Sequence, residues 1–118
     1  MTDPLRQVRE IALELPETEE RPSHGQPTFF VAGKQFAQFR NNHHNDHKTV
    51  VCVRVSSLDE QAVLLEADPE TYSKPAYMPS WLSISLVGES VDWDHVADRI
   101  AASWELAAPR RLLEAGGR

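Results

Sequence analysis

The fold is decided by TFFVAGKQFAQFR, residues 28–40, where two runs of strand-forming residues flank the dipeptide Gly33-Lys34. Phenylalanine and valine suit a pleated, half-buried strand, and a two-residue connection with glycine first is typical of a type II′ hairpin turn. After a polar stretch at 41–47, the β-branched run KTVVCVRV at 48–55 predicts another strand. The centre of the chain is therefore expected to hold three consecutive antiparallel strands.

Helical periodicity predicts a helix on each side of this strand block. An aspartate followed by proline suits the first turn of a helix over residues 4–15, where apolar side chains recur at helical spacing. The last helix is expected over residues 92–108, and its periodicity turns Trp93, Ile100 and Trp104 to the core.

The segments between these helices are predicted from caps and alternation. Ser57 and Glu60 match a capping box that starts a short helix. Residues 71–77 and 81–87 are expected to be extended, and the second of these alternates apolar and polar residues as a strand with one buried face does. Residues 16–22 begin and end with proline, so an irregular loop is expected there.

The predicted order is α-β-β-β-α-β-β-α, with residues 109–115 as a short helical tail. No βαβ alternation suggests parallel pairing, so the simplest packing is a two-layer α+β fold with one antiparallel sheet and helices on one face. The 118 residues, 41% of them apolar, suit a single domain over 1–118. No stretch is apolar enough to span a bilayer and the N-terminus lacks signal-peptide features, so a cytoplasmic protein without membrane contact is expected.

Charge is unevenly distributed along the chain, whose formal net charge is −6. Residues 21–54 hold five basic residues and one acid, a net charge of +4, whereas the remainder holds seven basic and 17 acidic residues, a net charge of −10. Four of the five histidines also lie in this basic middle. An acidic body argues against a polyanionic partner as a whole, but the basic middle offers a local contact surface for one.

Several stretches spread over the chain resemble the MmcQ/YjbR family. The opening signature is the most specific of them, and the others lie towards the C-terminus. They are LPETEERPSHGQPTF at 15–29, VAGKQFA at 31–37, Ala67-Asp68-Pro69, Tyr77, Trp81, VDW at 91–93 and WELAAPRRL at 104–112.

The resemblance implies a two-layer fold with the element order given above, similar to secretion chaperones and compared with frataxin-like proteins. It does not imply a known reaction, and the DNA-binding role often attached to family members rests on comparison of folds, which is a weak basis for function. The chain departs from the family at Met78-Pro79-Ser80, where members have a glycine-rich turn between tyrosine and tryptophan.

The basic middle provides the first set of candidate binding residues. Lys34 at the hairpin tip, with Arg40, Lys48 and Arg54 on adjoining strands, would form a basic strip along the sheet. A β-ribbon of this kind can enter a DNA groove or follow phosphates. The alternative is that these aromatic and basic residues serve core packing and charge balance.

Histidines provide two further candidate sites. His24 is held between Ser23 and the Gly25-Gln26-Pro27 turn, where it would present an imidazole to a ligand or simply anchor the first strand. A second group, within residues 43–47, has metal-ligand side chains in a polar turn, and a solvated loop without a bound metal is expected. These ligand types are His43, His44, His47 and Asp46.

Catalytic motifs are not found in the sequence. Cys52 lies in an apolar run, no Gly-x-Ser-x-Gly elbow occurs, and the glycines form no phosphate-binding loop. The sequence therefore favours a non-enzymatic binding domain without a cofactor, with duplex DNA bound weakly and in a salt-dependent way as the leading partner. The alternative is a protein-interaction or chaperone-like module that uses the sheet or the segment of Tyr77 and Trp81, and the third is a metal-binding or catalytic protein centred on His24 or residues 43–47.

Overall fold

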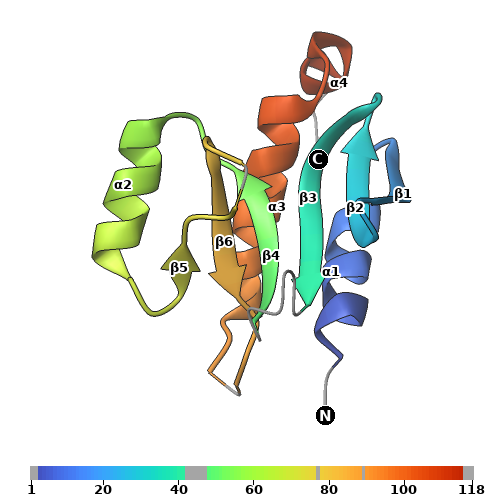
Figure 1. The fold of residues 1–118 in the computed structure, drawn as a ribbon. Coiled ribbons are helices and arrows are strands. Elements are labelled where there is room, and N and C mark those ends of the chain that lie inside the picture. The colour runs from blue at the N-terminus through green and yellow to red at the C-terminus, as the bar shows by residue number, and fades with distance from the viewer. Residues whose placement is uncertain (1–2, 42–47, 77, 89, 116–118) are drawn as a thin grey trace.

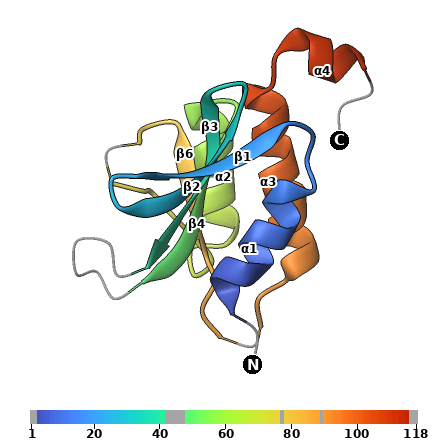
Figure 2. The same cartoon turned by 90° about the vertical axis from the view of Figure 1, so that its right-hand side faces the viewer.

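The computed structural model describes residues 3–41, 48–76, 78–88 and 90–115. Its elements, in chain order, are α1 (Pro4–Leu13), β1 (Thr18–Ser23), β2 (Gln26–Val31), β3 (Lys34–Asn41), β4 (Thr49–Arg54), α2 (Leu58–Ala67), β5 (Tyr72–Ser73), β6 (Trp81–Ser85), α3 (Trp93–Ala107) and α4 (Arg110–Glu114). The strands form one antiparallel sheet in the order β1-β2-β3-β4-β6-β5. Helices α1 and α3 cover one face of this sheet, and α2 lies beside its β5–β6 edge (Figures 1 and 2).

The predicted α+β class, with an antiparallel sheet and helices on one face, is confirmed. The strands predicted at 28–40, 48–55, 71–77 and 81–87 correspond to β2 to β6, although β5 is only two residues long. Within the described ranges, no helix is both long and apolar enough to cross a membrane.

The expectation of an irregular loop at 16–22 was wrong, because residues 18–23 form the strand β1. β1 pairs with β2 along its whole length at one edge of the sheet. Proline and solvated charges are tolerated in an edge strand, since one side of its backbone makes no ladder hydrogen bonds. Glu20 is also fixed from the helical layer by Arg9, whose Nε and Nη2 donate to the carboxylate at 2.8 and 2.9 Å. Pairing and this ion pair thus override the weak strand propensity of the segment.

The hairpin between β2 and β3 turns at Ala32-Gly33, one residue earlier than predicted, and Lys34 begins β3. Both turn residues have positive φ, 50° and 80°, which is the type I′ geometry rather than the expected type II′. The hairpin between β1 and β2 has the same turn geometry at His24-Gly25, with φ of 53° and 77°. Type I′ turns are favoured because their twist matches that of the paired strands.

The core lies between the sheet and the layer of α1 and α3. Alternate residues of the central strands face the helices, and Val51 and Val53 of β4 are fully buried there. Trp104 of α3 is the largest fully buried side chain, and its Nε1 donates to the Pro16 carbonyl at 3.1 Å. Trp93 was also predicted in the core, but it is only half-buried because it is the first residue of α3.

Helix α2 is attached to the sheet edge by hydrogen bonds more than by apolar burial. The predicted capping box forms with one change: Ser57 Oγ accepts from the Glu60 N–H at 3.0 Å, but the glutamate accepts from Ser56 instead, at 2.9 Å. Of its ten residues only Gln61 is fully buried, and its Nε2 donates to the Trp81 carbonyl at 2.7 Å.

Replacing Trp104 with alanine is expected to lower the free energy of unfolding by about 3–5 kcal/mol, because a large aromatic side chain leaves the centre of the core. Leu106→Ala on the same helix is the matched control, since Leu106 is 45% exposed and such surface changes cost about 0.5 kcal/mol or less. Urea unfolding followed by circular dichroism measures both. If the parent protein and Trp104→Ala unfold at the same urea concentration, this packing is contradicted.

Candidate functional site

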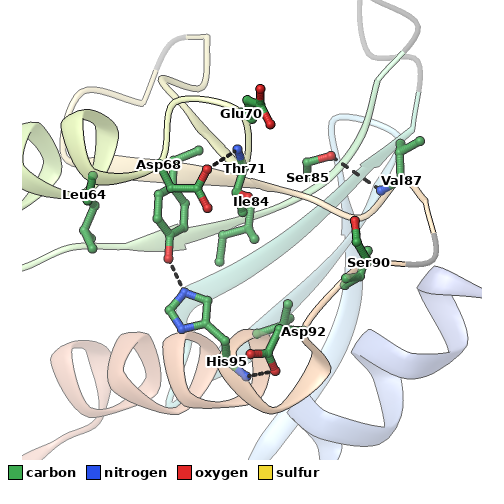
Figure 3. Close-up of a pocket in the computed structure, with 14 residues that line it drawn as sticks. Leu64, Asp68, Glu70, Thr71, Ile84, Ser85, Val87, Ser90, Asp92 and His95 are labelled. Carbon is green, nitrogen blue, oxygen red and sulfur yellow. Dashed lines mark hydrogen bonds between the residues drawn. The ribbon is translucent and has the colours of Figure 1, made fainter.

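A cleft of about 590 Å³ lies where the end of α2, the β5–β6 pair and the start of α3 meet (Figure 3). Apolar side chains such as Leu64 of α2, Ile84 of β6 and Val87 form part of its wall. A cavity of this volume is within the range of small-ligand sites, roughly 300–1,000 Å³. The cleft is therefore large enough for a small molecule or a long side chain of another protein.

Two residues that line the cleft, Tyr72 and His95, are hydrogen-bonded to each other, and Figure 3 shows His95 pointing into the cleft from α3. β5 pairs with β6 so that Tyr72 lies opposite Ile84, which turns the phenol to the helical layer. His95 lies in the first turn of α3, where Asp92 caps the helix by accepting from the His95 N–H at 3.1 Å. Burial raises the pKa of Tyr72, so the phenol keeps its proton at neutral pH.

Three carboxylates of the described residues line the cleft as well. Asp68 ends α2 and accepts from the Thr71 N–H through Oδ1 at 3.2 Å, while Asp92 uses its Oδ1 in the helix cap. Each of these aspartates is exposed, and its other oxygen can face a ligand. Glu70, the third carboxylate, is exposed at the same opening.

Among the described residues, no lysine or arginine lines the cleft. Arg99, one turn beyond His95 on α3, lowers the pKa of Tyr72 against the larger effect of burial. Lys48 lines a smaller hollow that shares Glu70 and Tyr72 with the cleft. Arg99 lies 3.4 Å from a carboxylate oxygen of Glu60 on α2, so its charge is partly compensated. The cleft is consequently a site of negative charge.

Metal ligation is not favoured by this arrangement. Among the described residues, no group of three or more His, Cys, Asp or Glu side chains is placed to hold a metal ion. The predicted loop of His43, His44 and His47 lies outside the described residues.

The predicted basic strip is not assembled at one place. Lys34 begins β3, and Lys48 directly precedes Thr49, which pairs with the last residue of β3. Seven residues of strand separate these ends, a distance of about 23 Å at about 3.3 Å per residue. Lys34 is exposed beside its turn, whereas Lys48 lines a smaller hollow of about 200 Å³ beside β5. His24 is exposed in the β1–β2 turn.

Three other predicted residues do share one surface, the sheet face opposite α1 and α3, which we call the open face. Arg40 and Arg54 alternate with the core residues of their strands and therefore point to the open face, where Trp81 of β6 packs with Val50 and Cys52. The Arg54 guanidinium lies over the Trp81 ring, 4.9 Å from its centre, and burial lowers the pKa of Arg54. Tyr77, predicted for the same segment as Trp81, lies outside the described residues.

Sequence reasoning missed Tyr72 and His95. A signal was available for each, since Asp92 predicts the start of α3 and places His95 in its first turn, and residues 71–77 were expected to be extended. What the sequence did not reveal is that the two-residue strand β5 pairs with β6 and so brings the phenol to the histidine.

Comparison with known proteins gives both a family and a shared fold. The YjbR family model matches residues 13–106. The structure is similar to the crystal structure of Deinococcus radiodurans protein DR2400, which has a DUF419 domain: the TM-score is 0.74 at 16% identity, over 94% of this chain and 85% of that one. No curated protein matches the chain. Because the family model spans most of the sequence, the protein belongs to the YjbR family.

Proposed function

We propose that this YjbR-family protein is a non-enzymatic binding domain whose ligand enters the cleft with a positively charged group. The observation that supports this most directly is the composition of the cleft, whose described lining includes Asp68, Glu70 and Asp92 but no lysine or arginine. In a partly enclosed site, opposite charges attract more strongly than they do in bulk water.

The chemistry of the ligand follows from the two kinds of wall. Carboxylates favour an ammonium or guanidinium group, whereas Leu64, Ile84 and Val87 offer apolar contact to an aliphatic part. A long cationic chain, which carries an apolar stem and a charged head, satisfies both. An organic cation therefore fits the cleft better than a bare metal ion does.

A binding role is favoured over catalysis by what His95 contacts. A histidine that activates a side-chain nucleophile needs that group within hydrogen-bond reach. His95 Nε2 is instead engaged by Tyr72, and burial raises the pKa of that phenol, which weakens it as a nucleophile.

Duplex DNA, the partner predicted from the charge split, stays a prediction. Its support is weakened by geometry, because Lys34 and Lys48 lie at opposite ends of β3 and Arg40 is only 8% exposed. A protein partner on the open face, the second predicted alternative, also stays a prediction, and the half-buried Arg54 is a better-placed contact for it than Trp81, which is buried.

Removing two charges from the cleft is expected to weaken binding of butylammonium and butylguanidinium probes about tenfold, equivalent to about 1.4 kcal/mol. Asp68→Asn with Asp92→Asn is suitable because asparagine keeps the acceptor oxygen of each turn and caps a helix as well as aspartate does. The control is Asp59→Asn with Glu66→Gln, which removes two exposed charges from α2 outside the cleft. Chemical-shift titration by NMR measures both, and an equal loss in the control would refute a local site.

Labelled duplex DNA is expected to bind only weakly in fluorescence anisotropy at low salt, and reversal of charge at Lys34 and Lys48 is expected to change little. The reason is that the two lysines are too far apart to form one continuous phosphate contact. Strong binding that this double variant abolishes, and that about 0.2 M salt suppresses steeply, would favour the nucleic-acid candidate over the cleft.

A further inference from the structure

The arginines of the open face differ from the other described arginines in having no carboxylate partner among the described residues. Six of the eight arginines in the described ranges have a carboxylate within 3.7 Å. The two that have no carboxylate among the described residues are Arg40 and Arg54, and both lie on the open face. Arg40 is 8% exposed and Arg54 is half-buried. This reverses the usual pattern, in which buried charges are paired.

Arg40 is held by neutral acceptors only, within the described part of the chain. Its Nε donates to Gln38 Oε1 at 2.8 Å, Nη1 to the Ala76 carbonyl at 3.3 Å and Nη2 to Met78 Sδ at 2.9 Å. A guanidinium has five N–H donors and does not lose its proton in proteins, so the charge persists and two donors remain beyond these three bonds. A thioether sulfur is a weak acceptor, so the contact with Met78 is readily exchanged.

The position of the guanidinium is fixed in advance. Gln38, which accepts from Arg40, itself donates to Thr28 Oγ1 at 3.0 Å and to the Ser23 carbonyl at 3.2 Å. Both Gln38 and Thr28 are buried. This chain of hydrogen bonds fixes the Nε side of Arg40, whereas Nη1 and Nη2 contact the segment of Ala76 and Met78, which covers them.

We propose that Arg40 is the centre of a second binding site, which takes a carboxylate attached to an apolar group. The carboxylate accepts from Nη1 and Nη2 together, the bidentate geometry that suits a guanidinium, and Met78 moves away from Nη2. Val50, Cys52 and Trp81 are buried under Met78, and they provide the apolar floor for the attached group once Met78 has moved. Binding supplies the counter-charge that Arg40 otherwise lacks among the described residues.

A monovalent acid fits this site better than a polyanion does. Among the described residues one guanidinium is within reach, because Arg54 lies four residues along β4 from Val50, the register partner of Arg40, which is about 13 Å. Lys48, two residues from Val50 in the other direction, lines the hollow beside β5. The net charge of −6 also opposes a ligand with many negative charges. Either a small carboxylic acid or an acidic side chain of a peptide has the required chemistry.

The experiment is an NMR titration of the full chain with four probes: hexanoate, hexanamide, inorganic phosphate and a Leu-Glu-Leu peptide whose termini are blocked and therefore uncharged. Hexanoate or the peptide is expected to cause chemical-shift changes at Arg40 and Met78 that reach saturation. Hexanamide is expected to bind at least tenfold more weakly. Saturation by hexanoate identifies a small-acid site, and saturation by the peptide alone identifies a protein partner. Equal binding of the amide, tighter binding of phosphate or no saturation by any probe overturns the proposal.

Variants separate a ligand site from a structural arginine. Arg40→Met is expected to bind hexanoate or the peptide at least tenfold more weakly and to melt no lower than the parent, because replacing an uncompensated buried charge with an apolar side chain is often neutral or stabilising. A clear fall in melting temperature with binding unchanged refutes the proposal. Met78→Leu keeps the apolar volume and is expected to bind about twofold to threefold more tightly, whereas Arg21→Met, which removes an exposed arginine paired with Glu19, should not change binding.

Discussion

The contact of α3 with β3 and β4 is the constraint on which the rest of the structure depends. Ser103 is fully buried, accepts from the Arg54 N–H at 2.8 Å and donates to the Phe36 carbonyl, so one hydroxyl joins α3 to both central strands. The next residue, Trp104, binds the Pro16 carbonyl and so fixes the chain as it enters β1. These two residues set both the rotation and the height of α3 on the sheet.

That placement determines where the cleft can form. His95 precedes Ser103 by eight residues, which is about 12 Å along a helix axis, and it therefore reaches the sheet edge where β5 pairs with β6. The same contact also affects the open face, because the backbone of Arg54 is held from the helical side while its side chain emerges on the other. The cleft and the open face are thus positioned by one helix, although they lie on opposite sides of the sheet.

The elements that the sequence predicted well are those with local causes. The cap at Asp92 and the helical spacing up to Trp104 predict α3, and the β-branched run at 48–55 predicts β4, because each pattern is contained within the element. β1 was missed because its stability comes from pairing with β2 and from Arg9 on α1, which are contacts between distant parts of the chain. The site was missed for the same reason, since Tyr72 and His95 meet only through the β5–β6 pair.

The charge of the chain illustrates a further limit of reasoning along the sequence. The net charge of +4 over residues 21–54 suggested a basic surface, but Arg40 is buried, Arg54 is half-buried and Arg21 has Glu19 at 3.7 Å. Charge that is buried or paired does not form a basic patch on the surface, while the net charge of −6 still gives the protein a negative field at long range. Such a field attracts cations from a distance, which favours the carboxylate-lined cleft as the site of first contact. An anion gains nothing from the long-range field and can be held only by a short-range contact with a guanidinium such as that of Arg40.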